Sequence, residues 1–307
     1  MAQRAELQNE FSWSLSRDGI FNACLRRYYY HYYGSWNGWR YDAPPDVKEL
    51  YLMKNLQTMP MWTGAVVHHV VQEAVKGLSA GRPVPPEVAV ATLTERMQRD
   101  WQDSASGRYR SRPNRMCGLA EHYYGLSVPA ESLHEAMVVA EGCIRRLYGA
   151  RSYQTMLELG PVSIVECEEL DTVSVSGFKV WVSPDVIMRD SQDQLLIVDW
   201  KTGVSTQKQE TVRQLAVYGI YALRTYGAST EQLVGVEENL RLGEDHVYNL
   251  KEWALEEARQ YIEGSIERMG RLLHDRERNI ALIRDFPMTD HLAACLDCRF
   301  RRACDRG

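Results

Sequence analysis

The 307-residue sequence lacks several features that would place it in common protein classes. It has no run of about 18 apolar residues, so no segment is predicted to span a membrane. Its first residues, MAQRAELQNEFSWS, are polar and lack the apolar core of a secretory signal peptide, which favours a cytoplasmic location. No internal repeat, long low-complexity tract or G-x4-G-K-[ST] phosphate-binding loop is present, so any ATP-driven unwinding would have to come from another protein.

The sequence also has no excess of positive charge, because its net charge is -5 and its isoelectric point is near 6.0. A nucleic-acid-binding protein of this charge must bind through a local basic patch. The stretch GRYRSRPNR offers one such patch, in a loop that also contains Ser, Gly and Pro, through Arg108, Arg110, Arg112 and Arg115. A solvated surface loop explains these residues at least as well.

Cysteine is present in a number that needs an explanation. Seven cysteines in a cytosolic chain argue against a disulfide framework and for metal binding, catalysis or burial. Three of them stand at x2 and x5 spacing in CLDCRFRRAC, at Cys295, Cys298 and Cys304. Metal sites built only from cysteine need four thiolates, so a fourth must come from elsewhere. No ligand spacing links the residues that we expect to be buried and apolar, Cys117, Cys143 and Cys167.

Local patterns predict an α/β fold, a small mixed sheet flanked by helices, with a helical N-terminal region. Residues 12–33 are predicted to form an aromatic-rich helix, and helical segments follow up to about 158. Three stretches, VSIVECEELDTVSV, FKVWVSPDVIMRD and QLLIVDW, predict three consecutive antiparallel strands. A helix over 208–226 and short strands at QLVGVEE and HVYNL come next, and residues 251 to about 283 are again predicted to be helical.

The stretch SPDVIMRDSQDQLLIVDWKTG carries the most informative polar residues. Asp185 follows Pro184 in one predicted strand, and Asp199 and Lys201 end the next, where alternation directs both to one face. Two aspartates from adjacent strands can hold a hard cation such as Mg²⁺. A lysine beside them can orient an attacking water or stabilise charge on a phosphate. An Asp–Lys ion pair without catalytic function is the commoner outcome of such a pattern alone.

Two predicted helices add further candidates. Gln214 and Tyr218 are spaced i, i+4 with Tyr221 on the same side, and this polar face suits a phosphate or a base, although an ordinary amphipathic helix has the same pattern. In TGAVVHHVVQEAV, His68 falls at the edge of the apolar stripe, while His69 points away from it. His68 is therefore the candidate metal ligand, although a single histidine more often has no such role.

Taken together, these residues resemble the PD-(D/E)XK nuclease superfamily, and within it the RecB/AddB-type branch. That branch includes stand-alone iron–sulfur exonucleases and the CRISPR-adaptation nucleases. The family motifs G-x-x-x-H, P-D, D-x-K and Q-x-x-x-Y occur in order, at Gly64 to His68, Pro184-Asp185, Asp199 to Lys201 and Gln214 to Tyr218. The stretch from Ser12 and Ser14 to Cys24 is similar to the first family motif, although Leu25 stands where the family often has proline.

The resemblance implies a restriction-endonuclease-like core and a Mg²⁺- or Mn²⁺-dependent deoxyribonuclease, acting as an exonuclease on single-stranded DNA. It implies that the metal ligands are His68, Asp185, Asp199 and the carbonyl of Trp200. Lys201 would assist the water nucleophile, and Gln214 and Tyr218 would position the substrate. The alternative is a non-catalytic or partner-dependent DNA-binding subunit of a repair or defence complex, and a helicase or a CRISPR protein is a candidate partner.

The same resemblance supplies the fourth thiolate. In the iron–sulfur members, one cysteine before the nuclease core joins three after it, which implies that Cys24 completes a [4Fe-4S] site with Cys295, Cys298 and Cys304. Four thiolates also suit tetrahedral Zn²⁺, so the ligands alone leave both metals open. Nearby arginines would then form a basic strip for phosphates, consisting of Arg26, Arg27, Arg299, Arg301 and Arg302.

These assignments divide the chain into four segments of one compact domain. Residues 1–60 form a helical segment that supplies one cluster cysteine, and residues 61–160 a helical region with the histidine motif. Residues 161–250 form the nuclease core, and residues 251–307 a helix followed by the cysteine segment.

Overall fold

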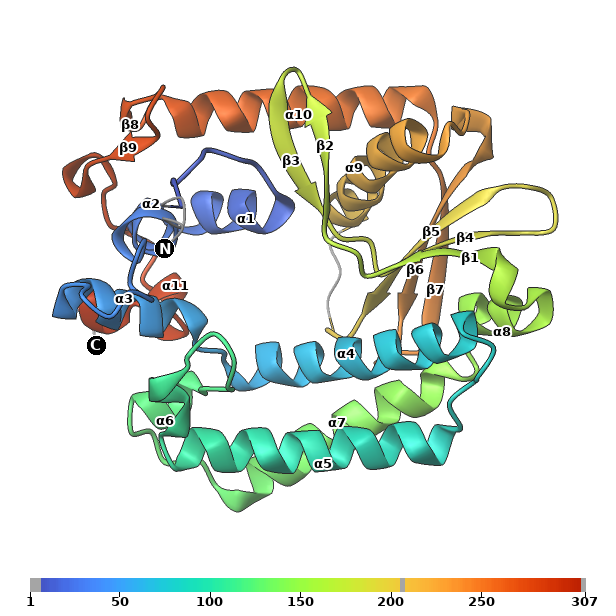
Figure 1. The fold of residues 1–307 in the computed structure, drawn as a ribbon, viewed down its shortest axis with the longest axis horizontal. Helices are drawn as coiled ribbons and strands as arrows, with labels where there is room; N and C mark the ends of the chain where they lie inside the picture. The colour runs from blue at the N-terminus through green and yellow to red at the C-terminus, as the bar shows by residue number, and fades with distance from the viewer. Residues whose placement is uncertain (1–6, 205–207, 305–307) are drawn as a thin grey trace, which may run out of the picture. The chain divides into compact units, whose positions relative to one another are not determined.

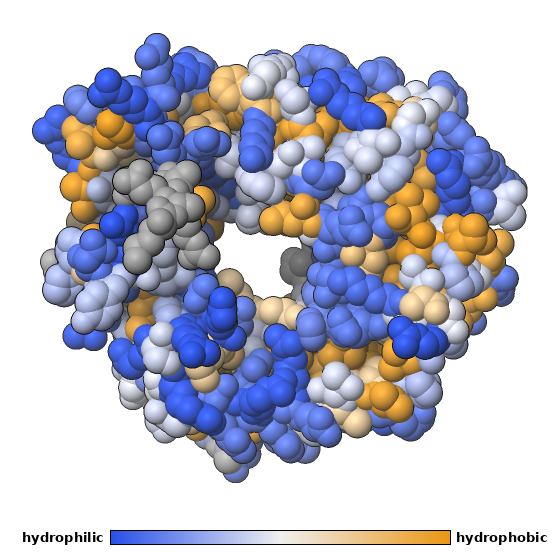
Figure 2. Space-filling view, viewed as in Figure 1, coloured by the Kyte–Doolittle hydropathy of each residue, from blue (hydrophilic) through white to orange (hydrophobic). Residues whose placement is uncertain are grey.

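The computed structural model describes residues 7–204 and 208–304, and the chain divides into two compact units (Figure 1). The terminal unit comprises Met1–Leu56, Ser174–Val180 and Ile262–Gly307. The sheet unit comprises Gln57–Val173 and Trp181–Tyr261. None of the described helices combines the length and the apolar character that crossing a membrane requires. The face shown in Figure 2 is largely hydrophilic, with apolar residues in separate patches.

The described part of the sheet unit contains a five-stranded mixed sheet with the order β1-β4-β5-β6-β7. Its strands are β1 (Ile164–Cys167), β4 (Val186–Arg189), β5 (Leu195–Lys201), β6 (Leu233–Asn239) and β7 (Glu244–Asn249). β5 and β6 pair in parallel, with Asp199 opposite Glu237, and the other neighbours pair antiparallel. The parallel pair requires a crossover, which the helix α9 (Lys208–Tyr226) provides. The predicted mixed sheet flanked by helices is confirmed, and so is the helix over 208–226.

The prediction of three consecutive strands before this crossover is wrong in number. The first stretch contains β1 and β2 (Asp171–Val175), and the second contains β3 (Phe178–Val182) and β4. β2 and β3 form a separate two-stranded sheet, connected through Ser176 and Gly177, which both have positive φ. Pro184 has no backbone N–H to donate, which favours a break between β3 and β4. The predicted antiparallel neighbours are nevertheless found, because β4 pairs with both β1 and β5.

Helices cover both faces of this sheet. On one side lie α4 (Met59–Ser79), α5 (Pro86–Ala105) and α7 (Ala130–Leu147), and α9 covers the other side (Figure 1). α4 has the periodicity expected of an amphipathic helix, and its buried residues include Val67, Val71, Ala74, Val75 and Leu78. Close packing of α9 on the sheet depends on Gly235, where a Cβ would lie 2.9 Å from the Leu215 side chain. This unit also contains the short helices α6 (Ala120–Tyr123) and α8 (Arg151–Leu159).

The terminal unit joins segments from both ends of the chain. The predicted single helix over 12–33 is wrong, because α1 (Leu15–Ala23) and α2 (Leu25–Tyr29) are separated at Cys24, whose backbone is extended. A π-helical turn, η1 (Tyr30–Gly34), follows α2. The backbone N–H of Arg26 donates to Pro287 O at 3.1 Å, and its Nε donates to Phe286 O at 2.7 Å. These distant contacts orient α2 independently of α1, which local helix propensity does not reveal.

The last part of the chain also differs from the sequence prediction. The helix expected over 251–283 ends earlier, because α10 spans Glu252–Gly270. A short hairpin follows, of β8 (Leu273–Asp275) and β9 (Ile280–Ala281), with Asn279 in the left-handed conformation at φ 53°. The remaining elements of this unit are α3 (Pro45–Asn55), η5 (Ile283–Asp285), α11 (Ala293–Leu296) and η6 (Arg301–Cys304).

Candidate functional site

The predicted residues of β5 and α9 form one hydrogen-bonded group in the sheet unit. Lys201 Nζ lies 2.5 Å from Asp199 Oδ2, so the two side chains share a face of β5 as strand alternation predicts. Gln214 of α9 joins both, because its Nε2 donates to Asp199 Oδ1 at 2.9 Å and its Oε1 accepts from Lys201 Nζ at 2.7 Å. Gln214 Nε2 also lies 3.1 Å from the hydroxyl of Tyr218. Four residues predicted from two separate motifs are thus in contact.

A second group forms where α4 passes the end of β4. His68 Nδ1 lies 3.2 Å from Asp185 Oδ1 and 3.8 Å from Glu168 Oε1. Ligand-type atoms of these three residues all lie within 4.8 Å of one another, the only such group of histidine, cysteine or acidic residues in the described ranges. An imidazole and two carboxylates suit a divalent cation that prefers oxygen and nitrogen ligands.

Glu168 is a member of this group that the sequence motifs did not identify. It follows β1 directly and has a positive φ of 47°. Its backbone N–H donates to the carbonyls of Pro184 and Asp185, so the turn after β1 is fixed against the residues that precede β4. The antiparallel register pairs Cys167 with Val186, which places the two acids that flank this pair side by side. The sequence does show an acidic residue directly after the first predicted strand. This residue can be recognised as a candidate metal ligand only once the pairing of β1 with β4 is known.

Asp185 connects the two groups. One of its oxygens faces His68, and the other accepts a hydrogen bond from the Trp200 backbone N–H at 2.7 Å. Trp200 itself is buried, and its indole N–H donates to Glu238 at 2.9 Å. The carboxylate of Asp185 is therefore oriented by the strand that also carries Asp199 and Lys201.

The charges of the site favour a bound cation. Burial raises the pKa of Asp199, and the negative charge of Asp185 raises it further, against the opposing effects of Lys201 and His68. Burial alone would lower the pKa of His68, but Asp185 and then Glu168 outweigh it and raise that pKa to about 10. The acids thus hold a proton on the imidazole where no metal supplies positive charge. A divalent cation would meet the same electrostatic demand, and the donor set therefore fits one.

Two tyrosines of α9 have different surroundings. Burial and the nearby Asp199 raise the pKa of Tyr218, so its phenol stays neutral beside Gln214. Tyr221 lies on the same side of the helix in sequence terms, but its hydroxyl contacts Glu166 at 2.8 Å and Asp171 at 3.2 Å instead. His69, which the helical wheel placed on the surface, is half-buried and does not join the metal-type group.

The four cysteines predicted as ligands all lie in the terminal unit. Cys24 separates α1 from α2. Tyr30, the residue after α2, donates from its hydroxyl to the backbone carbonyl of Ala303 at 2.8 Å, and Ala303 directly precedes Cys304. Cys298 is buried, and its pKa is raised by burial first and also by the charges of Cys24 and Cys295. Cys24 and Cys295 are thus close enough to Cys298 to affect its ionisation. No three thiols in the described part of the chain, however, have sulfur atoms that all lie within 4.8 Å of one another. Of the other cysteines, Cys143 and Cys167 are buried as predicted, whereas Cys117 is half-buried.

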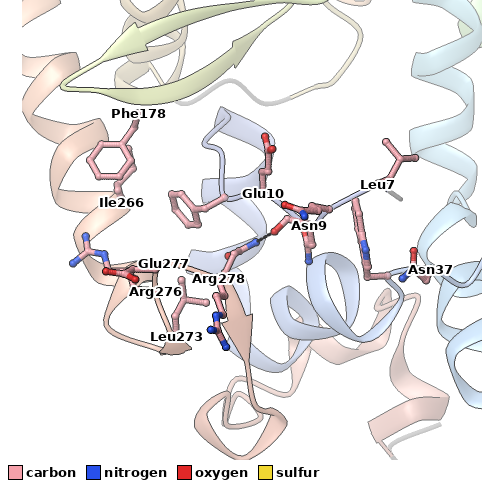
Figure 3. Close-up of a pocket in the computed structure, with 15 residues that line it drawn as sticks. Leu7, Asn9, Glu10, Asn37, Phe178, Ile266, Leu273, Arg276, Glu277 and Arg278 are labelled. Atoms are coloured by element: carbon pink, nitrogen blue, oxygen red, sulfur yellow. Dashed lines mark hydrogen bonds between the residues drawn. The ribbon is translucent and has the colours of Figure 1, made fainter. Parts of the chain in front are cut away.

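A separate cavity of about 760 Å³ lies in the terminal unit (Figure 3). Phe178 and Ile266 lie at one side of it, and Arg276 and Arg278 come from the segment that contains the β8–β9 hairpin. Asn279 donates from its side-chain amide to Asn9 O at 2.7 Å, the contact drawn in the figure. No metal-type group of histidines, cysteines and acids is found among its described lining residues, so this cavity is not the predicted catalytic centre.

Comparison with known families agrees with this geometry. A family model described as the PD-(D/E)XK nuclease superfamily matches residues 12–305. The match includes the G-x-x-x-H, P-D, D-x-K and Q-x-x-x-Y motifs as well as the cysteines of both ends. No curated protein matches the chain.

Proposed function

Since this chain belongs to the PD-(D/E)XK nuclease superfamily, we propose that it is a divalent-metal-dependent deoxyribonuclease that degrades single-stranded DNA from an end. The observation that carries the proposal is the convergence of the two groups in the sheet unit. Asp185 contacts His68 on one side and the Trp200 backbone on the other, and Trp200 stands between Asp199 and Lys201. The candidate metal ligands from α4 and from the start of β4 thus meet the candidate residues at the end of β5.

The metal site that we propose consists of His68, Asp185, Asp199 and the backbone carbonyl of Trp200, with Glu168 as an additional ligand. The bound Mg²⁺ or Mn²⁺ would supply Lewis-acid stabilisation of the negative charge that develops on the scissile phosphate. Asp185 is pre-oriented for this role by the Trp200 N–H. His68 must give up the proton that the acids hold on it before it can serve as a ligand, so metal binding releases a proton.

Lys201, Gln214 and Tyr218 are proposed to act on water and substrate. Lys201 is the cation of the group, and it lies close enough to Asp199 to orient an attacking water or to stabilise phosphate charge. The side-chain amide of Gln214 holds both members of this ion pair, because it accepts a hydrogen bond from the Lys201 amine and donates one to the Asp199 carboxylate. The neutral phenol of Tyr218 offers a further hydrogen bond for a phosphate oxygen or a base.

We further propose that the four cysteines of the terminal unit hold a [4Fe-4S] cluster with a structural role. Structural zinc sites usually pair two short C-x2-C segments. Here one distant cysteine joins a C-x2-C-x5-C segment, a pattern that favours iron–sulfur over zinc.

The sequence has no G-x4-G-K-[ST] pattern for binding ATP, so we propose that another protein separates the strands of duplex DNA. A helicase or a protein of a CRISPR or other defence complex is the kind of partner that would supply single strands to this site. The non-catalytic alternative is disfavoured, because side chains of every expected type are present in hydrogen-bonded positions.

The test uses linear and covalently circular single-stranded DNA of the same length, with Mn²⁺ or with EDTA. The intact chain should degrade the end-labelled linear strand only with Mn²⁺ and leave the circle intact, since a circle has no end. Asp199→Asn and Lys201→Ala should each lose cleavage, whereas the surface variant Arg278→Gln should retain it. Undiminished cleavage by Asp199→Asn would remove the assigned site, and degradation of the circle would replace the exonuclease with an endonuclease.

A further inference from the structure

The terminal unit contains buried positive charge that neutral groups surround. The Arg17 side chain is in a residue that is only 4% exposed. Its guanidinium donates to the hydroxyls of Tyr28 and Tyr33, both at 2.9 Å, and lies 4.4 Å from the centre of the Tyr32 ring. Aromatic faces and phenols soften the cost of burying a cation, but they do not supply a counter-charge.

Three further cations lie in the same neighbourhood. Arg27 Nε is buried without a hydrogen-bond partner among the described residues. The Lys54 amine lies 6.0 Å from the centre of the same Tyr32 ring. Arg299 is 7% exposed and donates to Lys54 O at 2.9 Å and to Leu56 O at 2.5 Å. We call Arg17, Arg27, Lys54 and Arg299 the cation cluster.

The neighbouring titratable groups do not neutralise Arg17, Arg27 or Lys54. Burial lowers the pKa of His31 to about 2, and Lys54, Arg299, Arg27 and Arg17 contribute in that order, so the imidazole is uncharged. Burial also raises the pKa of Tyr32 to about 12, which keeps its phenol neutral. No carboxylate within the described ranges lies within ion-pair distance of the charged nitrogens of Arg17, Arg27 or Lys54. Arg17 is buried and Arg27 and Lys54 are half-buried, so an anion beside them would stabilise these charges.

The cysteines are the source of negative charge that lies beside the cation cluster. Arg27 stands three residues after Cys24, in the first turn of α2. Arg299 is the next residue after Cys298. Four thiolates around a [4Fe-4S]²⁺ core or a Zn²⁺ ion carry a net charge of about -2, which two of these four cations would balance.

We propose that the cation cluster is the counter-charge of the four-thiolate metal centre formed by Cys24, Cys295, Cys298 and Cys304. The inference rests on the metal centre put forward above. It adds that Arg27 and Lys54 stabilise the anionic centre electrostatically, so they retain the metal and raise the reduction potential of an iron–sulfur cluster. Positive charge near such a cluster favours its more negative, reduced state.

The test compares Arg27→Gln and Lys54→Met with Arg27→Lys, which keeps the charge, and with the exposed Arg278→Gln, which removes an arginine elsewhere in the same unit. Each protein is purified anaerobically, its iron, sulfide and zinc contents are measured, and circular dichroism checks folding. The midpoint potential of the cluster is then measured by dithionite titration with visible and EPR detection. Arg27→Gln and Lys54→Met should contain less metal and have a more negative midpoint than the wild type, whereas Arg27→Lys and Arg278→Gln should not.

Lys54→Met keeps the apolar stem of a half-buried side chain, so it provides the measurement if Arg27→Gln fails to fold. For a zinc centre, faster release of zinc to a chromogenic chelator replaces the potential as the readout. If both Arg27→Gln and Lys54→Met kept the metal content and the potential of the wild type, the counter-charge role would be overturned and the metal centre would stand. A wild-type chain without iron or zinc would overturn both the proposal and the metal centre. Loss of the predicted DNA cleavage would leave it standing, because metal content and potential do not depend on hydrolysis.

Discussion

Gly64 of α4 lies against Thr202, the residue after Lys201, so closely that a Cβ on Gly64 would be 2.9 Å from Thr202 Oγ1. Real Cβ atoms essentially never come within that distance of another heavy atom. His68 follows Gly64 by about one helical turn, so this contact sets how near the histidine approaches the end of β5. The glycine of the G-x-x-x-H pattern is thereby explained as a packing requirement of the site.

Gly64→Ala should therefore lower the rate of DNA cleavage strongly while the protein still folds. The added methyl must displace the Thr202 hydroxyl, the Lys201–Thr202 segment or α4, and a misplacement of catalytic groups on the order of 1 Å can cost about 10²-fold in rate. We expect a loss of kcat for single-stranded DNA approaching that size, measured on the end-labelled linear strand. Removing the opposing oxygen relieves the contact, so the double variant Gly64→Ala/Thr202→Ala should recover part of the loss beyond the effect of Thr202→Ala alone.

The matched control is Gly142→Ala on α7, where the nearest atom to the added Cβ is the flexible end of Arg146 at 3.4 Å. This substitution should leave cleavage unchanged and stabilise the helix by about 0.5–1 kcal/mol, since alanine has the higher helix propensity. Full activity of Gly64→Ala would show that the close approach is not needed for the catalytic geometry.

Much of the site follows from sequence because each motif contributes through local geometry. Alternation along β5 places Asp199 and Lys201 together, and the i, i+4 spacing on α9 places Gln214 beside Tyr218. The position of His68 at the edge of the apolar stripe of α4 likewise agrees with its contact to Asp185. These relations need only the periodicity of a helix or a strand.

What sequence reasoning missed depends on contacts between distant segments. Glu168 joins His68 only because β1 pairs with β4 in one particular register. The helix break at Cys24 accompanies hydrogen bonds from Arg26 to residues 286–287, more than 250 positions away. The early end of α10 and the β8–β9 hairpin were likewise absent from the pattern, because a continuous helical period masked the turn that contains Asn279. Tertiary pairing overrides local preference in each case.

Metal binding gives a direct test of the site that does not require cleavage. Mn²⁺ at about 100 times its Kd should raise the free energy of unfolding by about 2.7 kcal/mol, and EDTA should reverse the effect. Asp185→Asn should abolish this Mn²⁺-dependent increase, and Glu168→Gln should reduce it, because each removes a carboxylate from the group around His68. Chemical denaturation with and without Mn²⁺ provides the measurement.

The exposed α5 variant Glu95→Gln removes the same charge away from the site and should behave as the wild type. If Glu168→Gln kept the full increase, Glu168 would be excluded as a ligand. If Asp185→Asn kept it, the metal would have to bind elsewhere.

His122 should make the stability of the sheet unit depend on pH. Ser104 Oγ accepts a hydrogen bond from Leu119 N–H at 2.7 Å and lies 2.8 Å from His122 Nδ1, so its own hydrogen suits an unprotonated Nδ1. Burial lowers the pKa of His122 below its usual value of 6.5. Below that pH the unfolded chain therefore binds more protons than the folded chain, and the free energy of unfolding falls as the pH drops.

The substitution His122→Gln should remove this part of the acid sensitivity. Urea denaturation between pH 8 and pH 5 should show the wild type losing stability relative to the variant below about pH 6.5, with a constant difference above it. Parallel profiles over the whole range would mean that His122 titrates identically in the folded and unfolded chains.

Cys24 is the residue through which the proposed metal centre would connect the two ends of the chain. Cys24→Ser should lose the bound iron, since a [4Fe-4S] cluster needs four thiolates and serine is a poor substitute ligand. The link from Cys24 to Cys295 closes a loop of roughly 270 residues, and cross-links that close such long loops are worth about 4 kcal/mol or more in the chain-entropy account. We therefore expect the variant to have lower thermal stability and its terminal unit to be digested faster by proteases. Iron assay, calorimetry and limited proteolysis are the measurements.

The control is Cys117→Ser. Cys117 is a half-buried cysteine of the sheet unit whose sulfur lies 4.0 Å from the Gln57 side-chain oxygen, so this substitution removes a thiol outside the metal centre and should change none of these quantities. Because both substitutions exchange sulfur for oxygen, a full iron content in Cys24→Ser would show that the fourth ligand is a different residue.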